Sequence, residues 1–328
     1  MRVAVCIITY QRPEGLKLLL EGLNGLDFMR CEAPSLVIIV VDNDSAGLAC
    51  RFCEETRSNL NWPLKCFVEP RRGIPYARNK AVACAREEHV DFVAFIDDDE
   101  VPDPFWLDEL MYVQRLHNAD AVTGPQLPRF TAPFSGSIMS KEFFELPRYP
   151  TGHPMTWAST GNILIRSEVF EKMNKLFDER FALSGGSDTH FFWRAMRAGY
   201  KFVWADDAVV HEWIPESRAN VRWLLQRWYR VGNVENRFRL DFDPSIATRA
   251  SLVAEASKRI VSGLSVLRRA LAVKRRPLIR MRRFRSPLKV VWRRRLLIKS
   301  LRQVSEGAGM LSGAVGIHYE EYRRTHGA

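Results

Sequence analysis

The sequence predicts an α/β fold in which helices flank a mostly parallel β-sheet, followed by a basic helical appendage at the C-terminus. Two observations carry this prediction. Apolar, β-branched runs alternate with stretches of helical periodicity in the first part of the chain, and such continuous apolar strands are typical of parallel sheets buried on both faces. The hydrophobic content of 46% and the charged content of 27% are those of a folded, globular chain.

The expected elements follow one another in a regular order. Strands are expected over four apolar runs, at residues 3–9, 36–41, 64–68 and 90–96. Pro75 and Pro104 each precede a helical stretch, where the fixed φ of proline suits the first turn. Prolines and aromatic residues predict an irregular lobe or lid over residues 125–157. Further strands are expected at 161–165, 201–204 and 208–211, and further helices from about 167 and over 188–198.

The charge of the chain is unevenly distributed. The net charge is +11 for 328 residues. Residues 217–328 hold 26 Lys and Arg against 7 Asp and Glu, a net charge of +19, which leaves −8 for residues 1–216. This change in charge predicts a boundary near residue 217, and it indicates that the acidic body and the basic appendage meet different partners.

The cysteines and the N-terminus bear on the compartment of the protein. All six cysteines lie between Cys6 and Cys84 without a regular spacing, and we interpret them as reduced thiols of a cytosolic protein. Cys50 and Cys53 have a CxxC spacing, but no second pair completes a metal site, so we interpret them as two helix residues. The N-terminal apolar run has no cleavage site of a signal peptide, and no apolar run reaches the length of a membrane span.

A cluster of carboxylates directly follows the fourth apolar run. Asp97, Asp98, Asp99 and Glu100 come after the strand that ends at Ile96. Alternate side chains of an extended chain point the same way, so Asp97 and Asp99 can converge. Hard oxygen ligands of this kind suit Mg²⁺ or Mn²⁺. A solvated acidic turn, or a helix N-cap ahead of Pro104, is the alternative that these residues alone leave open.

The ends of the other strands predict a nucleotide site. The first strand closes with Thr9 and Tyr10, the second with Asp42, and Arg78 lies one turn into the next helix. Together they offer an aromatic ring for stacking on a base, a carboxylate for its N–H groups and a guanidinium for carbonyl or phosphate oxygens. No glycine-rich phosphate loop occurs in the sequence, which argues against hydride transfer and P-loop chemistry.

The ordered set of these stretches resembles family 2 glycosyltransferases of the GT-A fold, closest to the bacterial succinoglycan-type exopolysaccharide enzymes. The resemblance covers about residues 3–215 and rests on these stretches: Ile7-Ile8-Thr9-Tyr10-Gln11-Arg12-Pro13, Val41-Asp42-Asn43-Asp44-Ser45, Gly73-Ile74-Pro75-Tyr76-Ala77-Arg78-Asn79 and Phe95-Ile96-Asp97-Asp98-Asp99. It implies a Rossmann-like nucleotide-sugar-binding half (1–125) and an acceptor-binding half (126–216) within a GT-A domain (1–216).

The resemblance also implies roles for single residues. Thr9, Tyr10, Asp42 and Arg78 would contact the base of a nucleotide sugar, usually a UDP-sugar. Asp97 and Asp98 would lie near the ribose and the diphosphate. Asp99 would hold the Mn²⁺ or Mg²⁺, with Asp97 and His211 nearby as further ligands.

The candidate general base is Asp188, in Gly185-Gly186-Ser187-Asp188. The resemblance places the base of inverting enzymes in an acidic pair at a helix start, and this chain has Ser187 where the first acid is common. Ser187 is expected to cap the helix, whose dipole would keep Asp188 ionised. An ionised carboxylate in reach of an acceptor hydroxyl can remove its proton. An acid that merely stabilises the helix start is the alternative.

The basic appendage (217–328) combines cations with large apolar residues, above all at 274–285 and 290–299. This mixture is typical of helices that lie in the interface of an anionic bilayer. A solvated basic face is the alternative, and nucleic acid is not expected as a partner because no nucleic-acid-binding module appears.

The expected function is that of a metal-dependent, inverting glycosyltransferase of the hexosyltransferase type. It would move a single sugar to an acceptor hydroxyl, on a lipid-linked oligosaccharide of exopolysaccharide or cell-envelope glycan synthesis. The expected location is cytoplasmic, peripheral at the inner face of the cell membrane. A sugar-nucleotide nucleotidyltransferase, and a non-catalytic binder of nucleotide sugars or nucleic acid, are the alternatives.

Overall fold

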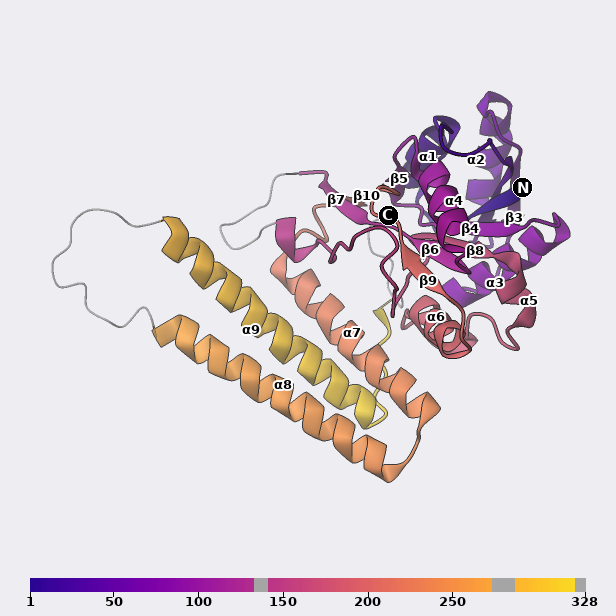
Figure 1. Ribbon diagram of the computed structural model, residues 1–328. Coiled ribbons are helices and arrows are strands. Elements are labelled where there is room, and N and C mark those ends of the chain that lie inside the picture. Colours follow the sequence, from indigo (N-terminus) through magenta and orange to yellow (C-terminus); the bar gives the residue numbers. More distant parts are fainter. Residues whose placement is uncertain (133–140, 273–286, 322–328) are drawn as a thin grey trace. The chain divides into compact units, whose positions relative to one another are not determined.

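The computed structural model describes residues 1–132, 141–272 and 287–321 (Figure 1). The described chain forms two compact units, one of residues 1–132 and 141–216 and one of residues 217–272 and 287–321. The first is an α/β unit and the second is helical. The α/β fold predicted from the alternation of apolar strands and helices is therefore confirmed.

The first unit is built on a seven-stranded sheet with the order β3-β2-β1-β4-β8-β6-β9. The four apolar runs form its first four strands, β1 (Arg2–Thr9), β2 (Ser35–Asp42), β3 (Leu64–Val68) and β4 (Phe92–Ile96), all parallel where they pair. β8 (Asn162–Arg166) runs antiparallel to both β4 and β6 (Ala121–Thr123), and β9 (Phe202–Trp204) pairs with β6 in parallel. The sheet is thus mostly parallel, as the sequence predicts.

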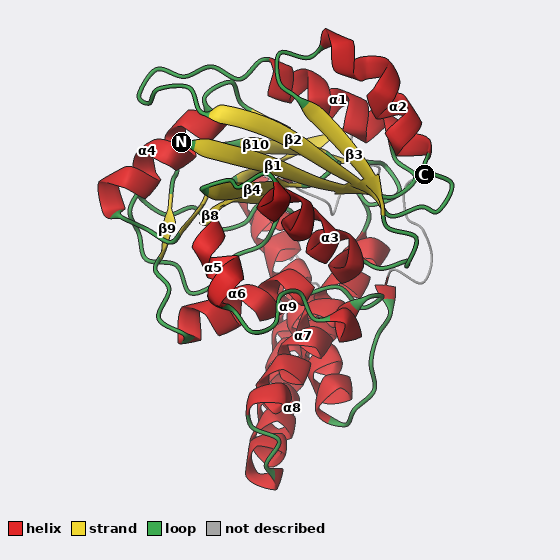
Figure 2. Ribbon diagram, turned by 90° about the vertical axis from the view of Figure 1, so that its right-hand side faces the viewer, coloured by secondary structure: helices red, strands yellow, loops and turns green. Residues whose placement is uncertain are grey.

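Helices cover both faces of this sheet (Figure 2). Apolar side chains of α1 (Pro13–Asn24), α2 (Leu48–Thr56) and α4 (Trp106–His117) pack on one face. Those of α3 (Ile74–Glu87), α5 (Ser167–Lys172) and α6 (Ser187–Arg197) pack on the other. Proline lies in the first turn of α1 and of α3, where its missing N–H costs no helical hydrogen bond. Three short 3₁₀ turns complete the unit, η1 (Arg57–Asn59), η2 (Lys141–Phe143) and η3 (Glu179–Phe181).

A second sheet of three strands takes one of them from the stretch for which the sequence predicts an irregular lobe. Its order is β5-β10-β7, with β5 (Glu100–Pro102), β10 (Val210–Ile214) and β7 (Gln126–Phe130). The expectation of an irregular lobe over the whole of 125–157 is therefore wrong for 126–130. The prolines misled because Pro128 lies in an edge strand, where a missing N–H is tolerated.

The buried side chain of Asn162 connects the two sheets. It accepts a hydrogen bond from the Trp106 indole at 2.8 Å and donates to the carbonyl oxygens of Ala208 (2.7 Å) and Pro125 (3.1 Å). Satisfied buried amides of this kind fix one arrangement of the segments that they join. The acidic stretch between β4 and β5 is thereby held between two anchored sheets.

The second unit consists of α7 (Val221–Phe242), α8 (Ile246–Ala272) and α9 (Pro287–Ala314) (Figure 1). The backbones of α7 and α9 approach closely, because a Cβ added to Gly309 would clash with the carbonyl group of Tyr229. The buried carboxylate of Glu306 on α9 is paired with Arg302 at 2.6 Å and with Arg259 on α8. The helical character that the sequence predicts for this part of the chain is found in these three helices.

The runs that the sequence assigns to a bilayer surface fall mostly outside the described structure. The run 274–285 lies outside the described residues, and so do the side chains at 290–293. Ile298, an aliphatic residue of the second run, is buried within the helical unit and is not available for insertion. In the described part of the chain, no helix combines the length and the low charge that a membrane span requires.

Candidate active site

The ends of β1, β2 and β4 meet at one edge of the main sheet. β1 lies between β2 and β4, and Thr9 and Asp42 are direct partners across the first pair. The carboxyl ends of parallel strands share an edge of the sheet. Thr9 and Asp98 consequently meet, and the Thr9 hydroxyl donates to Asp98 Oδ2 at 2.8 Å.

A cationic side chain contacts the acidic tip, which we define as Asp97, Asp98 and Asp99. Arg12 Nη1 lies 2.9 Å from Asp98 Oδ1 and 2.9 Å from Asp99 Oδ2. Burial raises the pKa of Asp98, whereas the charge of Arg12 lowers it. Arg12 has no role predicted from the sequence, because its contact depends on the path of the turn between β1 and α1. The available signal is a guanidinium three residues after the end of β1.

The crowding of carboxylates affects Asp97. Burial raises the pKa of its carboxyl, Arg78 opposes this increase, and the charges of Asp99 and Asp188 add to it. The Asp97 backbone N–H donates to Glu100 Oε2 at 2.9 Å, and burial raises the pKa of Glu100 as well. Buried like charges raise each other's pKa when no cation compensates them. The tip therefore carries more negative charge than its own cations balance.

Arg78 joins the acidic tip to the candidate base. Its Nη2 lies 3.8 Å from Asp97 Oδ1, and its Nη1 lies 3.8 Å from Asp188 Oδ2 and donates to the Ser187 hydroxyl at 3.3 Å. Arg78 is buried on α3, whereas Asp188 lies in the first turn of α6. Asp97 and Asp188, which are 91 positions apart in the sequence, therefore meet on one guanidinium.

The start of α6 differs in one respect from the expectation. The N-cap is Gly186, in the left-handed region with φ of +84°, and Ser187 is the first helical residue. The Ser187 hydroxyl accepts from Arg78 and makes no capping hydrogen bond. The expectation that Ser187 caps the helix is wrong, since glycine supplies the conformation that the turn requires. Asp188 lies in the first turn of α6, as expected.

Tyr10 and the loop after β3 lie on the side of β2. The Arg72 guanidinium lies 5.1 Å from the centre of the Tyr10 ring. Asn43 holds the same loop, because its Nδ2 donates to the carbonyl oxygens of Glu69 and Arg71 and its Oδ1 accepts from the Gly73 N–H. Asn43 thereby sets the start of α3, the helix that carries Arg78.

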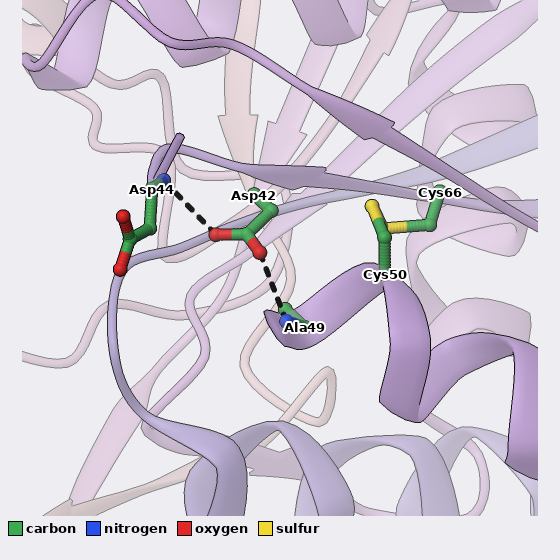
Figure 3. Close-up of a disulfide and its surroundings, with 5 residues drawn as sticks. All are labelled: Asp42, Asp44, Ala49, Cys50 and Cys66. Atoms are coloured by element: carbon green, nitrogen blue, oxygen red, sulfur yellow. Dashed lines mark hydrogen bonds between the residues drawn. A yellow bond between two sulfur atoms is a disulfide. The ribbon is translucent and has the colours of Figure 1, made fainter. Parts of the chain in front are cut away.

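Asp42 accepts hydrogen bonds from two backbone N–H groups with its buried carboxylate. Asp44 N donates to Oδ1 at 3.0 Å and Ala49 N, at the start of α2, donates to Oδ2 at 2.9 Å (Figure 3). Burial raises the pKa of Asp42, and these hydrogen bonds lower it. The carboxylate position thus depends on where α2 begins.

A disulfide lies beside this contact and corrects the interpretation of the cysteines. Cys50 in the first turn of α2 is bonded to Cys66 in β3 (Figure 3). The expectation of six reduced thiols is wrong for this pair, and Cys50 is more than a helix residue. Cys6, Cys31, Cys53 and Cys84 are free and buried. The sequence did not reveal the bond because Cys66 reaches α2 only through the pairing of β3 with β2.

His211 lies in β10, where it is paired with Val101 of β5, and the nearby Trp213 N–H donates to the Asp99 carbonyl oxygen at 2.8 Å. His211 Nε2 lies 2.8 Å from Asp103 Oδ1 and 3.2 Å from Arg129 Nη2. Within the described residues, no hydrogen bond of His211 to Asp97 or Asp99 is formed. The structure therefore places His211 with Asp103, and its role as a metal ligand stays a prediction.

The donor chemistry of the tip fits a divalent cation. The three carboxylates of the tip supply the hard oxygens that Mg²⁺ and Mn²⁺ prefer. In the described part of the chain, no group of three or more His, Cys, Asp or Glu side chains already forms a metal cluster. Substrate oxygens commonly complete the shell of Mg²⁺, so few protein ligands are needed.

The chain matches two sequence families. The model described as glycosyl transferase family 2 matches residues 4–173, and that described as glycosyl transferase family group 2 matches residues 92–303. The chain is similar to the succinoglycan biosynthesis protein ExoM of Rhizobium meliloti, with 32% identity over 239 residues, 72% of this chain and 75% of ExoM. It is also similar to the glycosyltransferase AglE of Haloferax volcanii, with 24% identity over 70% of this chain and 71% of AglE.

Solved structures with the same fold include a mannosyltransferase and TarS. The mannosyltransferase PcManGT of Pyrobaculum calidifontis, in complex with GDP-Man and Mn²⁺, has a TM-score of 0.57 at 17% identity, covering 95% of this chain and 86% of PcManGT. Residues 1–349 of TarS from S. aureus have a TM-score of 0.50 at 20% identity, covering 75% of this chain and 68% of that chain. At these identities the likeness concerns the fold alone.

Proposed function

Because the chain belongs to glycosyl transferase family 2 and has the GT-A fold, we propose that it is an inverting enzyme that transfers a single sugar from a UDP-sugar to an acceptor hydroxyl. The observation that carries the mechanism is the position of Arg78 between Asp97 and Asp188. This position brings Asp97, which is proposed to lie near the diphosphate, and Asp188, the proposed proton acceptor, within reach of one sugar. A base and a leaving group on opposite sides of the anomeric carbon are what a single inverting displacement requires.

Asp188 is the general base of the proposed reaction. Its carboxylate takes the proton of the acceptor hydroxyl while that oxygen bonds to the anomeric carbon and the bond to the nucleoside diphosphate breaks. Arg78 and the start of α6 hold Asp188 in place. The other end of the site stabilises the negative charge that develops on the leaving diphosphate.

The donor lies along the ends of β1, β2 and β4 in this proposal. Tyr10 and Asp42 bind the base, with Thr9 and Arg78 at the edges of the nucleotide. Asp97 and Asp98 approach the ribose and the diphosphate, and Asp99 holds the Mn²⁺ or Mg²⁺. A divalent ion in this position supplies the positive charge that a diphosphate needs between itself and the carboxylates.

The proposed acceptor is a lipid-linked oligosaccharide of exopolysaccharide synthesis at the inner face of the cell membrane. The name of ExoM as a succinoglycan biosynthesis protein supports the class of product. The net charge of +19 on residues 217–328 supports association with an anionic membrane surface.

The test is a screen of nucleotide sugars with Mn²⁺ or Mg²⁺, in which donor hydrolysis is compared between the wild type and Asp99→Ala. We expect hydrolysis of one donor class that requires the metal and is reduced at least about 100-fold by the substitution. Glu142→Ala, which removes an exposed acid elsewhere, is the control. Binding of polynucleotide in place of UDP in calorimetry would contradict the proposal.

A further inference from the structure

One side of α8 carries large apolar side chains that no other part of the described chain covers. Ile246, Val261, Leu264 and Leu271 are 87%, 65%, 50% and 51% exposed, and we call them the outer face of α8. Val261, Leu264 and Leu271 are three and seven residues apart, a spacing that brings them to one side of a helix. The outer face extends over about 38 Å at 1.5 Å per residue.

α8 also has an inner side, which packs within the helical unit. Leu252, Ala256 and Ala270 on the same helix are fully buried, and Gly307 of α9 packs against Ala256 and Ile260. α8 therefore has two apolar sides, and packing within the unit uses one of them. Surface helices of globular units usually have a single apolar stripe, so the second stripe requires a separate explanation.

The exposed apolar residues are concentrated in the helical unit. Of the sixteen large exposed hydrophobic residues in the described chain, eight lie in residues 217–321. This unit has fewer than half as many described residues as the α/β unit. Single exposed apolar residues are ordinary, but an aligned row of them indicates a surface that another phase or molecule covers.

Cations flank the outer face of α8. Lys258, Arg268 and Arg269 are exposed, and none of the three forms an ion pair with another described residue. Glu255, the sole acidic residue in the sequence of α8, is paired with Arg239 at 2.7 Å. The surface beside the apolar row is therefore positive without compensation, which fits a partner with many negative charges.

We propose that the outer face of α8 is a docking surface for an anionic lipid bilayer. The aliphatic side chains enter the region between headgroups and acyl chains, while Lys258, Arg268 and Arg269 contact lipid phosphates. The apolar residues are distributed over most of the length of the helix, and cations lie beside them. This arrangement fits the extended, planar surface of an anionic bilayer. The inference rests on the proposed membrane association and assigns it to a defined helix face.

The experiment measures cosedimentation of the full-length protein with phosphatidylcholine vesicles that contain or lack phosphatidylglycerol, without donor or acceptor. The face variant carries Val261→Ser, Leu264→Ser and Leu271→Ser, which leaves every cation of the chain in place. We expect the wild type to bind the vesicles that contain phosphatidylglycerol, and the face variant to bind them at least about tenfold more weakly.

The matched control carries Leu18→Ser, Met29→Ser and Leu116→Ser, which are exposed to a similar extent in the α/β unit. It should bind vesicles like the wild type, and circular dichroism should show that both variants keep their helix content. Equal binding of the face variant and the wild type would overturn the proposal and assign binding to charge alone. Conversion of a wild-type dimer to a monomer by the face variant, without a change in vesicle binding, would overturn it in favour of self-association.

Discussion

Arg78 is the residue at which the two ends of the candidate site meet. It is buried, it lies near both Asp97 and Asp188, and its Nε has no hydrogen-bond partner among the described residues. A buried guanidinium that retains one donor is suited to contact an oxygen of a bound substrate. Substitution of either neighbouring carboxylate will therefore change the electrostatics at the other, so the two should not be treated as independent sites.

Asp188→Asn tests the role of the base at this scale. Asparagine keeps the shape of the side chain but accepts no proton, so we expect transfer to fall by about 10²- to 10⁴-fold while nucleotide affinity changes little. The measurement is single-turnover transfer together with calorimetry of UDP binding. Glu168→Gln, the same change in the first turn of α5, is the control. Normal turnover of Asp188→Asn would place the base elsewhere.

At the scale of elements, two contacts fix the positions of helices, one for α2 and one for α9. The Cys50–Cys66 disulfide connects α2 to β3 beside the contact of Asp42 with Ala49. The glycines of α9 allow it to lie directly against the α7 backbone. The first contact belongs to the candidate nucleotide site, and the second belongs to the helical unit that carries the outer face of α8.

Removal of the disulfide by Cys50→Ser with Cys66→Ser should lower the free energy of unfolding by about 3 kcal/mol, because the unfolded chain loses a loop closure of 16 residues. Since the start of α2 then moves more freely, Asp42 loses part of its fixation and UDP affinity should fall. Urea unfolding and calorimetry measure the two effects. A dithiol reductant should weaken UDP binding by the wild type and leave the double variant unchanged. Equal sensitivity of both proteins would separate the disulfide from the nucleotide site.

Gly309→Ala tests the close contact of α7 and α9. The added Cβ would clash with the Tyr229 carbonyl group, so the helices must separate, at a cost of about 1–3 kcal/mol in the stability of the helical unit. Gly25→Ala is the control, because its added Cβ would meet its nearest atom, the Gly22 carbonyl oxygen, at 3.5 Å. Thermal unfolding followed by circular dichroism compares the two. A transition of Gly309→Ala equal to that of Gly25→Ala would contradict the close packing.

At the scale of the whole molecule, the sequence predicts the α/β sheet well because the signals for its strands are local. Each of the first four strands is a mostly apolar run, and the position of Thr9, Asp42 and Asp97 at the ends of such runs brings them to one edge. The features that were missed depend on contacts between distant residues. Arg12 meets Asp98 across 86 positions, Cys66 meets Cys50 through a neighbouring strand, and β7 forms despite Pro128 because it lies at an edge.

The division into two units predicts how ligand binding affects unfolding. A nucleotide with Mn²⁺ binds the α/β unit in the proposed function, so at 100 times its dissociation constant it should stabilise that unit by about 2.7 kcal/mol. Differential scanning calorimetry should show a shift of one transition, with the transition of the helical unit unchanged. The Asp99→Ala variant should show a smaller shift. A common shift of both transitions would mean that the units unfold together.

The guanidinium of Arg12 between Asp98 and Asp99 has a consequence for the order of ligand arrival. A divalent ion that comes by itself must compete with the Arg12 guanidinium, which is part of the chain and already contacts two of the three carboxylates. A diphosphate that comes by itself faces the remaining negative charge. We therefore expect ion and nucleotide to enter as a preformed complex, and the spent nucleotide to depart still carrying its ion.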